Sequence, residues 1–386
     1  MWFGSKATVG LDIGSSLVKA VQLRRAGRSI ELEKLGIAEI FPSAERPTDP
    51  VVVRQAKIDA ARRALQTAGI SAKNAISAVS GESVIVRYIQ LPEMPESDLK
   101  NTLRYEAEEY IPFRIEDVNL DSVVLGRSEE GGVVKIDVLL VSAKKELIDQ
   151  HLQIVREAGL TPTVIDVDSF AFLNCFEINH EPSSQDVVGL VNIGSSITSI
   201  NIYVGGVSRF SRDISIAGDT ITTAIQSRLG VGFAEAEEMK RAEGAPALEG
   251  RPADEAATEK SLIDTIRTAV EQMAGQSMGE STPEAIVSKA IRNTLTNLTG
   301  EIRRSIQFYE NQTRGKVVQK IVLGGGASRL KGLDAFLQHE MNLPVEFINP
   351  LARISPTGFG LDRELAESSR ELLGVGIGLA LRGVME

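Results

Sequence analysis

Residues 9–19 have the sequence Val-Gly-Leu-Asp-Ile-Gly-Ser-Ser-Leu-Val-Lys. Apolar residues lead into an Asp, a Gly and two hydroxyl residues, and apolar alternation then resumes, which predicts a β-hairpin with a polar tip. Gly14 allows the backbone to approach a ligand closely, and free N–H groups and hydroxyls at such a tip suit phosphate oxygens. Asp12 is placed to hold a hydrated Mg²⁺, and Lys19 to reach back as a point charge.

A second copy of this pattern lies far along the chain. Residues 191–198 have the sequence Val-Asn-Ile-Gly-Ser-Ser-Ile-Thr, and Ile-Gly-Ser-Ser is identical at 13–16 and 193–196. A single copy is explained equally well by an ordinary glycine turn between strands. The repetition favours two similar domains, each of which contributes one loop to a shared cleft.

The composition narrows the class of protein. The chain has 386 residues, enough for two or more domains, and 42% hydrophobic and 24% charged residues, which is typical of a soluble protein. Its net charge of −10 argues against a broad nucleic-acid surface, so we expect no nucleic-acid partner. The single cysteine, Cys175, lies in an apolar run, which predicts core packing and excludes disulfides and multi-cysteine metal sites within one chain.

The sequence contains no segment that predicts export or membrane insertion. The N-terminal run Met-Trp-Phe-Gly-Ser-Lys is too short for a signal peptide, and no apolar run reaches the length of a bilayer span. We therefore expect a cytoplasmic protein without a transmembrane segment. Any membrane contact would come through a partner or a small patch.

An α-β-β-α block interrupts the first half of the chain. Helical spacing predicts helices at 97–110 and 147–155, and strand signals predict a hairpin at 118–125 and 133–142. We predict an α/β protein of three parts: a first domain at 1–91 plus 163–185, a small inserted subdomain at 92–162, and a second domain at 186–386 with a smaller subdomain at 218–316. The stretch 242–285, rich in Ala, Glu, Gly and Pro, predicts no definite structure.

Three consecutive glycines, Gly324, Gly325 and Gly326, follow the buried strand predicted at 317–323. They either let a ring or a ribose lie on bare backbone or make a tight turn from strand to helix, and the length of the run favours a ligand. The Walker A motif is absent, and the glycines at 374–378 miss the dinucleotide spacing GxGxxG. P-loop and Rossmann folds are therefore excluded.

Glu237 and Lys240 lie one helical turn apart within Ala-Glu-Glu-Met-Lys. Taken alone, this spacing is better explained by a surface ion pair worth a few tenths of a kcal/mol than by a ligand contact.

Taken in order, these motifs resemble the actin, heat-shock-70 and sugar-kinase superfamily. The set comprises DxGSxxxK at 12–19, the second loop at 192–198, Gly-Asp-Thr at 218–220, the Ala-Glu-x-x-Lys pattern and Gly-Gly-Gly-Ala at 324–327. Within the superfamily the chain is most similar to the branch of the cell-division protein FtsA, which carries a relocated subdomain where residues 92–162 stand here. The N-terminal stretch and the motif Val-Ile-Asp-Val-Asp-Ser-Phe-Ala-Phe resemble the PilM family of type IV pilus assembly proteins.

The resemblance implies a two-domain actin-like (ribonuclease-H-like) ATPase fold with an FtsA-type insert, and a site for ATP and Mg²⁺. Asp12 would anchor Mg²⁺ through water. The implied nucleotide-binding residues are Gly14, Ser15, Ser16 and Lys19 on one side of the phosphates, Gly194, Ser195, Ser196 and Thr198 on the other, and Gly218, Glu237, Lys240, Gly324, Gly325, Gly326 and Ala327 around ribose and adenine.

One position departs from the pattern of the family. The second phosphate loop often begins with Asp, and here it begins with Asn192, whose amide cannot take a proton from water. Losing a general base typically costs about 10²–10⁴ in rate. Asp166 or Asp168 either compensates or ends a strand. No catalytic residue is assigned, and we expect tight ATP binding with at most slow hydrolysis.

Three functions remain. The first is an ATP-dependent scaffold that captures the cytoplasmic N-terminus of the inner-membrane protein PilN in a groove by the inserted subdomain, as the resemblance implies, and is thereby tethered to the inner membrane and other pilus assembly proteins. The second is an FtsA-like protein that polymerises and binds membrane. The third is a sugar- or acid-kinase-like phosphotransferase, which Asn192 argues against. Whether the chain forms homo-oligomers stays open.

Overall fold

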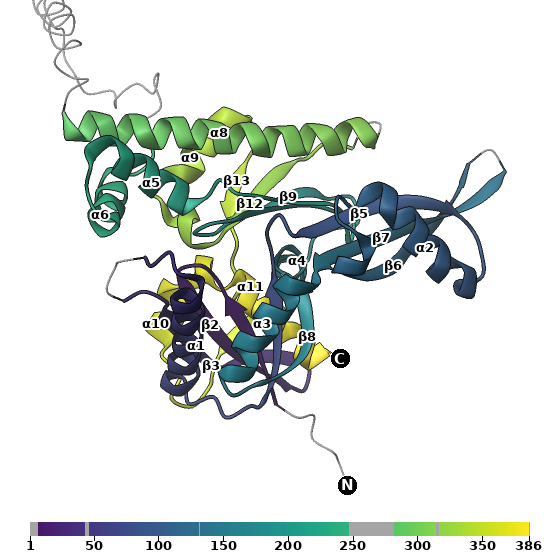
Figure 1. The fold of residues 1–386 in the computed structure, drawn as a ribbon, viewed down its shortest axis with the longest axis horizontal. Coiled ribbons are helices and arrows are strands. Elements are labelled where there is room, and N and C mark those ends of the chain that lie inside the picture. Colours follow the sequence, from purple (N-terminus) through teal and green to yellow (C-terminus); the bar gives the residue numbers. More distant parts are fainter. Residues whose placement is uncertain (1–6, 43–45, 131, 247–281, 314–315, 386) are drawn as a thin grey trace, which may run out of the picture.

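A computed structural model describes residues 7–42, 46–130, 132–246, 282–313 and 316–385. The stretch 247–281, most of the segment for which the sequence predicted no definite structure, lies outside the described residues. The described chain forms three sheets with helices packed on them (Figure 1). None of its described helices combines the length and the apolar character that crossing a bilayer requires.

The first sheet carries the first repeated motif. Its strand order is β14-β3-β2-β1-β4-β8, with β1 antiparallel to β2 and parallel to β4. The strands are β1 (Thr8–Ile13), β2 (Leu17–Ala26), β3 (Ser29–Glu39), β4 (Asn74–Val79), β8 (Thr161–Val167) and β14 (Ile354–Pro356). Alternate residues of β2 enter two different cores, because successive side chains of a strand point to opposite faces.

Helices cover both faces of this sheet. The core on one face includes residues of α1 (Pro50–Thr67) and α3 (Lys145–Glu157), and the core on the other includes residues of α4 (Asp168–His180) and α11 (Gly374–Met385). Helix α1 begins where the Asp49 carboxylate accepts the N–H of Val51 and Pro50 takes the first helical position.

The second sheet carries the second motif. Its strand order is β11-β10-β9-β12-β13, with β9 antiparallel to β10 and parallel to β12. The strands are β9 (Val187–Ile193), β10 (Thr198–Val204), β11 (Val207–Ile214), β12 (Lys320–Gly324) and β13 (Val345–Phe347). One face packs against α5 (Gly218–Leu229), α6 (Phe233–Glu243), α8 (Pro283–Gln312) and α9 (Leu333–Met341).

Helix α4 connects the two sheets. Its residues Phe172 and Phe176 share one core with strands of both sheets and with Cys175, which is fully buried as predicted. The short element η2 (Gly326–Arg329) follows β12, and α10 (Arg363–Ser368) and η3 (Arg370–Leu372) lead from β14 to α11.

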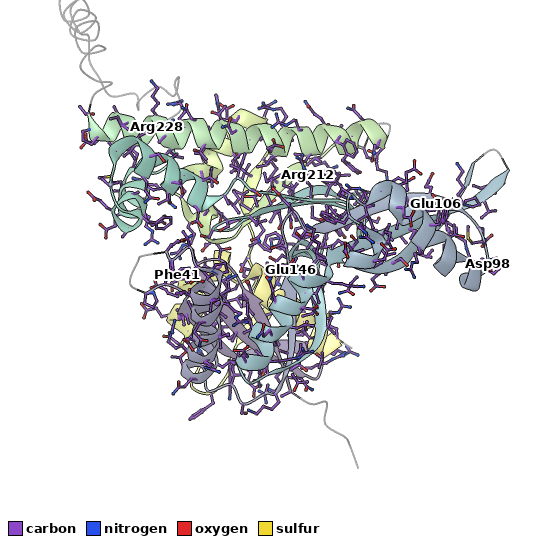
Figure 2. All side chains as sticks on the ribbon, viewed as in Figure 1. Phe41, Asp98, Glu106, Glu146, Arg212 and Arg228 are labelled. Atoms are coloured by element: carbon purple, nitrogen blue, oxygen red, sulfur yellow. The ribbon has the colours of Figure 1, made fainter. Side chains whose placement is uncertain are left out.

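The third sheet forms the insert, with strand order β5-β7-β6. It comprises β5 (Val84–Pro92), β6 (Val118–Glu130) and β7 (Val133–Lys144), and its core includes α2 (Glu96–Tyr110) and η1 (Ile115–Asp117). Figure 2 shows Asp98 and Glu106 on the part of α2 that projects away from the other two sheets. The predicted helix at 97–110 and the hairpin at 118–142 are both present.

Four elements lie elsewhere than their predicted domain limits imply. Strand β5 lies almost wholly before the predicted start of the insert at residue 92 yet pairs with β7 of the insert, and α3 lies within 92–162 yet packs on α1 of the first domain. Strand β14 pairs with β3, and α11 packs on β1, although both fall in the range assigned to the second domain. The spacing of residues in the sequence cannot reveal which domain such an element joins, because this depends on contacts between segments far apart in the chain.

Candidate functional site

The first predicted hairpin tip forms between β1 and β2. The N–H of Gly14 donates to the Leu17 carbonyl over 3.0 Å and closes the turn. At the base of the tip the Asp12 side chain, in a residue only 7% exposed, accepts a hydrogen bond from Lys19 Nζ at 2.8 Å. The antiparallel register places these two residues opposite each other. The predicted metal residue and the predicted phosphate lysine therefore neutralise each other.

The second tip joins β9 to β10 with the same kind of turn. The N–H of Gly194 donates to the Ile197 carbonyl over 2.9 Å. The hydroxyls of Ser195 and Ser196 donate to Asp219, on the first turn of α5, at 2.7 and 3.0 Å. This tip is thus fastened to the start of a helix in its own domain.

The two tips are in contact. Ser16 Oγ and Ser195 Oγ lie 2.6 Å apart, in residues 179 positions apart in the sequence. Ser15 lies half-buried beside this contact. The geometry that the shared-cleft hypothesis requires is therefore present.

Arg46, which precedes α1, lies at the same contact and was not among the predicted residues. Its guanidinium donates to Ser16, to Ser195 at 3.2 Å, and to Asp219, with which it forms an ion pair. It also lies 4.2 Å from the centroid of the Phe233 ring on α6. One side chain of the first domain thereby contacts three residues of the second.

Glu237 and Lys240 of α6 form a buried bridge to α5 instead of a surface pair. Lys240 Nζ donates to the Glu237 carboxylate at 2.5 Å, to the Thr222 hydroxyl at 2.9 Å and to the Gly218 carbonyl at 3.2 Å. Burial lowers the pKa of Lys240, and the Glu237 charge opposes this. Burial acts to raise the pKa of Glu237, but Lys240, Thr222 and Arg241 together outweigh it, so this pKa is lowered. The bridge places both residues next to Gly218.

The glycine run after β12 is largely explained by close packing. A Cβ on Gly324 would lie 2.5 Å from the ring of Phe172, and a Cβ on Gly325 would lie 2.3 Å from the Ile193 carbonyl oxygen. Gly325 also has a φ of 89°, which side chains disfavour. The tight-turn alternative therefore accounts for these two glycines without a ligand.

The end of the same run faces α5. The Ala327 side chain lies 3.1 Å from the position that a Cβ on Gly218 would take, and Gly326 packs near Leu372. Gly218, Lys240 and Ala327 are therefore neighbours, as the resemblance implied for a site around ribose and adenine.

Three carboxylates lie where the two domains meet: that of Asp12, a buried residue, and those of Asp168 and Asp213, which are half-buried residues. Burial and, next, the Asp12 charge raise the pKa of Asp168 to about 7, while a hydrogen bond with Ser80 opposes the shift. Burial also raises the pKa of Asp213, which accepts the N–H of Gly81 at 2.6 Å. A cation would relieve the repulsion between Asp12 and Asp168. Among the described residues, no group of three or more His, Cys, Asp or Glu side chains is placed to bind a metal.

The side chains of two residues near the second tip contact other parts of the second domain. The hydroxyl of Thr198, a fully buried residue, donates to the Ile216 carbonyl at 2.7 Å and fixes β10 to the segment before α5. The side-chain oxygen of Asn192 lies 2.8 Å from the position of a Cβ on Gly325, so the amide packs against the glycine turn.

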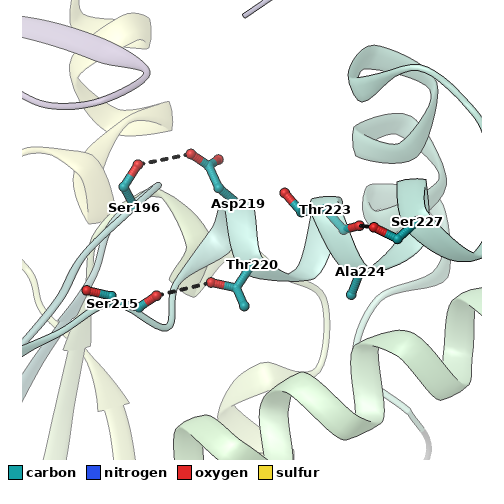
Figure 3. A pocket seen from close by; sticks show the side chains of 7 residues that line it. All are labelled: Ser196, Ser215, Asp219, Thr220, Thr223, Ala224 and Ser227. Atoms are coloured by element: carbon teal, nitrogen blue, oxygen red, sulfur yellow. Dashed lines mark hydrogen bonds between the residues drawn. The ribbon is translucent and has the colours of Figure 1, made fainter. Parts of the chain in front are cut away.

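A cavity of about 500 Å³ lies beside the site along α5 (Figure 3). Hydroxyls dominate its lining, which is Ser196, Ser215, Asp219, Thr220, Thr223, Ala224 and Ser227. Glu237 and Lys240 are not in this lining, because they contact the opposite face of α5. The cavity thus adjoins the phosphate loops without including the residues implied for adenine.

Two residues of the site, Asp219 and Arg46, were not predicted from the sequence, whereas Asp168 was named there as one of two acids that either compensate for Asn192 or end a strand. Asp219 lies inside the quoted Gly-Asp-Thr motif, so the signal for it was present. Arg46 stands in an irregular proline-rich segment that matches no motif, and only the folded chain brings it to the tips.

A model of the family described as type IV pilus assembly protein PilM matches residues 10–248 and 257–384. The chain belongs to the PilM family. Its curated relatives include the cell division protein FtsA of Pseudomonas aeruginosa, 25% identical over 360 residues that cover 88% of this chain and 82% of the relative. The FtsA match agrees with the branch expected from the sequence.

Solved structures establish the fold. A chain of the "PilM-PilN type IV pilus biogenesis complex" is 28% identical, with a TM-score of 0.73 and 98% of each chain covered. MreB 5 of Spiroplasma citri bound to AMPPNP is 11% identical, with a TM-score of 0.51 and coverage of 98% of this chain and 96% of that one. The predicted α/β actin-like architecture of this PilM-family chain is confirmed.

Proposed function

We propose that this PilM-family chain is an ATP-binding scaffold of type IV pilus assembly that holds the cytoplasmic N-terminal segment of PilN. The observation that carries the nucleotide part is the contact between Ser16 and Ser195, because it brings both phosphate-loop candidates to one point. The similar PilM-PilN complex supports the partner. Binding to an inner-membrane partner would tether the chain to the membrane.

The residues at the tips fit a triphosphate with a hydrated Mg²⁺. Phosphate oxygens accept hydrogen bonds, and the tips offer the hydroxyls of Ser16, Ser195 and Ser196 together with the cation of Lys19. Hard cations prefer oxygen ligands, and Mg²⁺ keeps much of its water, so one or two carboxylates suffice. Asp12 supplies the carboxylate, and bound Mg²⁺ would neutralise phosphate charge.

The chemistry of the site favours holding ATP over cleaving it rapidly. Asn192 packs on a glycine turn and has no basic group. Asp168 is the remaining candidate base, since burial and Asp12 raise its pKa to about 7. We propose slow hydrolysis, in which Asp168 accepts a proton from the attacking water.

Asp12→Ala tests the nucleotide site. We expect loss of measurable Mg-ATP binding by isothermal titration calorimetry, with an unchanged circular dichroism spectrum, because the change removes one ion pair at the end of β1 and leaves the backbone pairing of β1 with β2 intact. Asp59→Ala is the matched control, since Asp59 is an exposed carboxylate of α1 in the same domain. Equal ATP affinity in Asp12→Ala and the wild type would show that the metal has been assigned to the wrong residue.

A PilN N-terminal peptide tests the partner. We expect the full chain to bind a fluorescently labelled peptide in an anisotropy titration, and Mg-ATP to change the affinity. A scrambled peptide of the same composition is the control. Absence of binding both with and without Mg-ATP would refute the scaffold.

A further inference from the structure

Arg46 occupies the point where the two domains meet at their tips. Its side chain is 25% exposed, and its hydrogen-bond partners are the hydroxyls of Ser16 and Ser195 and the carboxylate of Asp219. Phe233 packs against the guanidinium from α6. All of these polar partners are oxygen atoms that accept hydrogen bonds from the planar guanidinium of Arg46.

This donor geometry matches a phosphate group. A guanidinium presents parallel N–H groups that bind phosphate oxygens in pairs, and it remains charged when it loses water contacts. The serines that contact Arg46 are those to which a phosphate between the tips would bind. A phosphate there would therefore lie within reach of Arg46.

The charge balance also calls for this residue. Lys19, paired with Asp12, lies at the base of the first tip, and Arg46 adds a second cation at the serine contact itself. Close to the serine contact stands the acid Asp219, which would repel a phosphate without a cation beside it. Arg46 is paired with that acid, and a terminal phosphate, which carries more negative charge than a carboxylate, competes with Asp219 for the guanidinium.

We propose that Arg46 recognises the terminal phosphate of a bound nucleoside triphosphate, exchanging its ion pair with Asp219 for that phosphate. The inference rests on the proposed ATP site and adds the residue that distinguishes triphosphate from diphosphate. Arg46 belongs to the first domain and Asp219 to the second. Binding of a terminal phosphate would therefore break an ion pair between the two domains.

The test compares affinities for a non-hydrolysable ATP analogue and for ADP, each with Mg²⁺, in the full-length wild type and Arg46→Ala. A charge-assisted hydrogen bond lost from the complex predicts roughly a 10- to 100-fold weaker affinity for the triphosphate. The affinity for ADP should change by less than about threefold. Arg46→Lys, which keeps the charge without the fork, should give an intermediate loss for the triphosphate.

Arg24→Ala is the matched control, because Arg24 is an exposed arginine of β2 that pairs with Glu31 away from the tips. Thermal melting checks that each variant folds. Equal losses for both nucleotides would overturn the proposal and leave Arg46 as a tie between the domains. Unchanged or tighter triphosphate binding would overturn it as well. A wild type that binds neither nucleotide would refute the ATP site itself, which is a different outcome.

Discussion

His151 of α3 is a buried titratable residue that supports the first tip from behind. The Ser77 hydroxyl donates to the Leu11 carbonyl at 2.5 Å and lies 2.8 Å from His151 Nε2. Because a hydroxyl has a single hydrogen, His151 Nε2 must be the donor to Ser77, which assigns the neutral tautomer. Burial and, to a lesser degree, the Lys57 charge lower the pKa of His151 to about 4.

This pKa predicts a loss of stability in acid. Between about pH 6.5 and 4 the unfolded chain binds a proton at His151 that the folded chain does not, so the free energy of unfolding falls by up to about 1.4 kcal/mol per pH unit. His151→Gln should remove this component. Urea denaturation of both proteins at pH 7.5, 6 and 5 measures it. Parallel losses in the two proteins would contradict the assignment, whatever other groups such as Asp168 contribute.

At the scale of elements, α11 shows how glycine permits two helices and a sheet to pack closely. A Cβ on Gly378 would lie 1.7 Å from the Ala171 carbonyl oxygen of α4, and a Cβ on Gly10 would lie 2.5 Å from the Ala380 nitrogen of α11. The glycines that failed the dinucleotide pattern therefore form a packing surface.

Gly378→Ala should lower the stability of the protein, although a change from glycine to alanine in a helix ordinarily raises it. In an exposed helix the change stabilises by about 1 kcal/mol. Here the new methyl group must displace α4 backbone, so we expect destabilisation by about 2–4 kcal/mol. Gly232→Ala is the control, because a Cβ there meets nothing within 4 Å. Chemical denaturation compares them, and a Gly378→Ala variant as stable as the wild type would refute the close contact.

At the scale of the whole molecule, strand β5 connects the tips to the inserted subdomain. Just before β5, Gly81 donates to Asp213, and Glu82 accepts the Ser215 hydroxyl at 2.8 Å. Further along, the Tyr88 hydroxyl bonds to Ser208 of β11. We therefore expect movement of the second domain against the first to be transmitted along β5 to the insert, where the resemblance places the partner groove.

Tyr88→Phe tests this connection. We expect the separate affinities for Mg-ATP and for the PilN peptide to stay within about threefold of the wild type, while the change in peptide affinity caused by Mg-ATP shrinks, since such coupling typically amounts to about 1–3 kcal/mol. Tyr105→Phe is the control, because Tyr105 is 80% exposed on α2. A variant with full coupling would show that the Tyr88 contact transmits nothing.

The local hydrophobic pattern predicted many helices and strands of this protein, and the repeated Ile-Gly-Ser-Ser segment predicted that two hairpin tips meet. Identical Ile-Gly-Ser-Ser segments specify identical turns, which is why both tips and their contact could be predicted. Arg46 could not, because its role depends on a loop folding across a domain boundary. The same limit explains β14 and α11, whose partner strands β3 and β1 lie more than three hundred residues earlier in the chain. A hydrophobic pattern indicates that an element is buried, but it does not identify the element against which it packs.

The return of β14 and α11 to the first sheet bears on biosynthesis. All strands of the second sheet fall between residues 187 and 347, whereas the first sheet needs residues 354–356 for its edge and residues 374–385 for a helix that covers it. A ribosome releases these segments after every strand of the second sheet. The half of the protein encoded later would thus reach its native sheet while the half encoded first still waits for its final pieces, the reverse of the usual N-to-C order of folding.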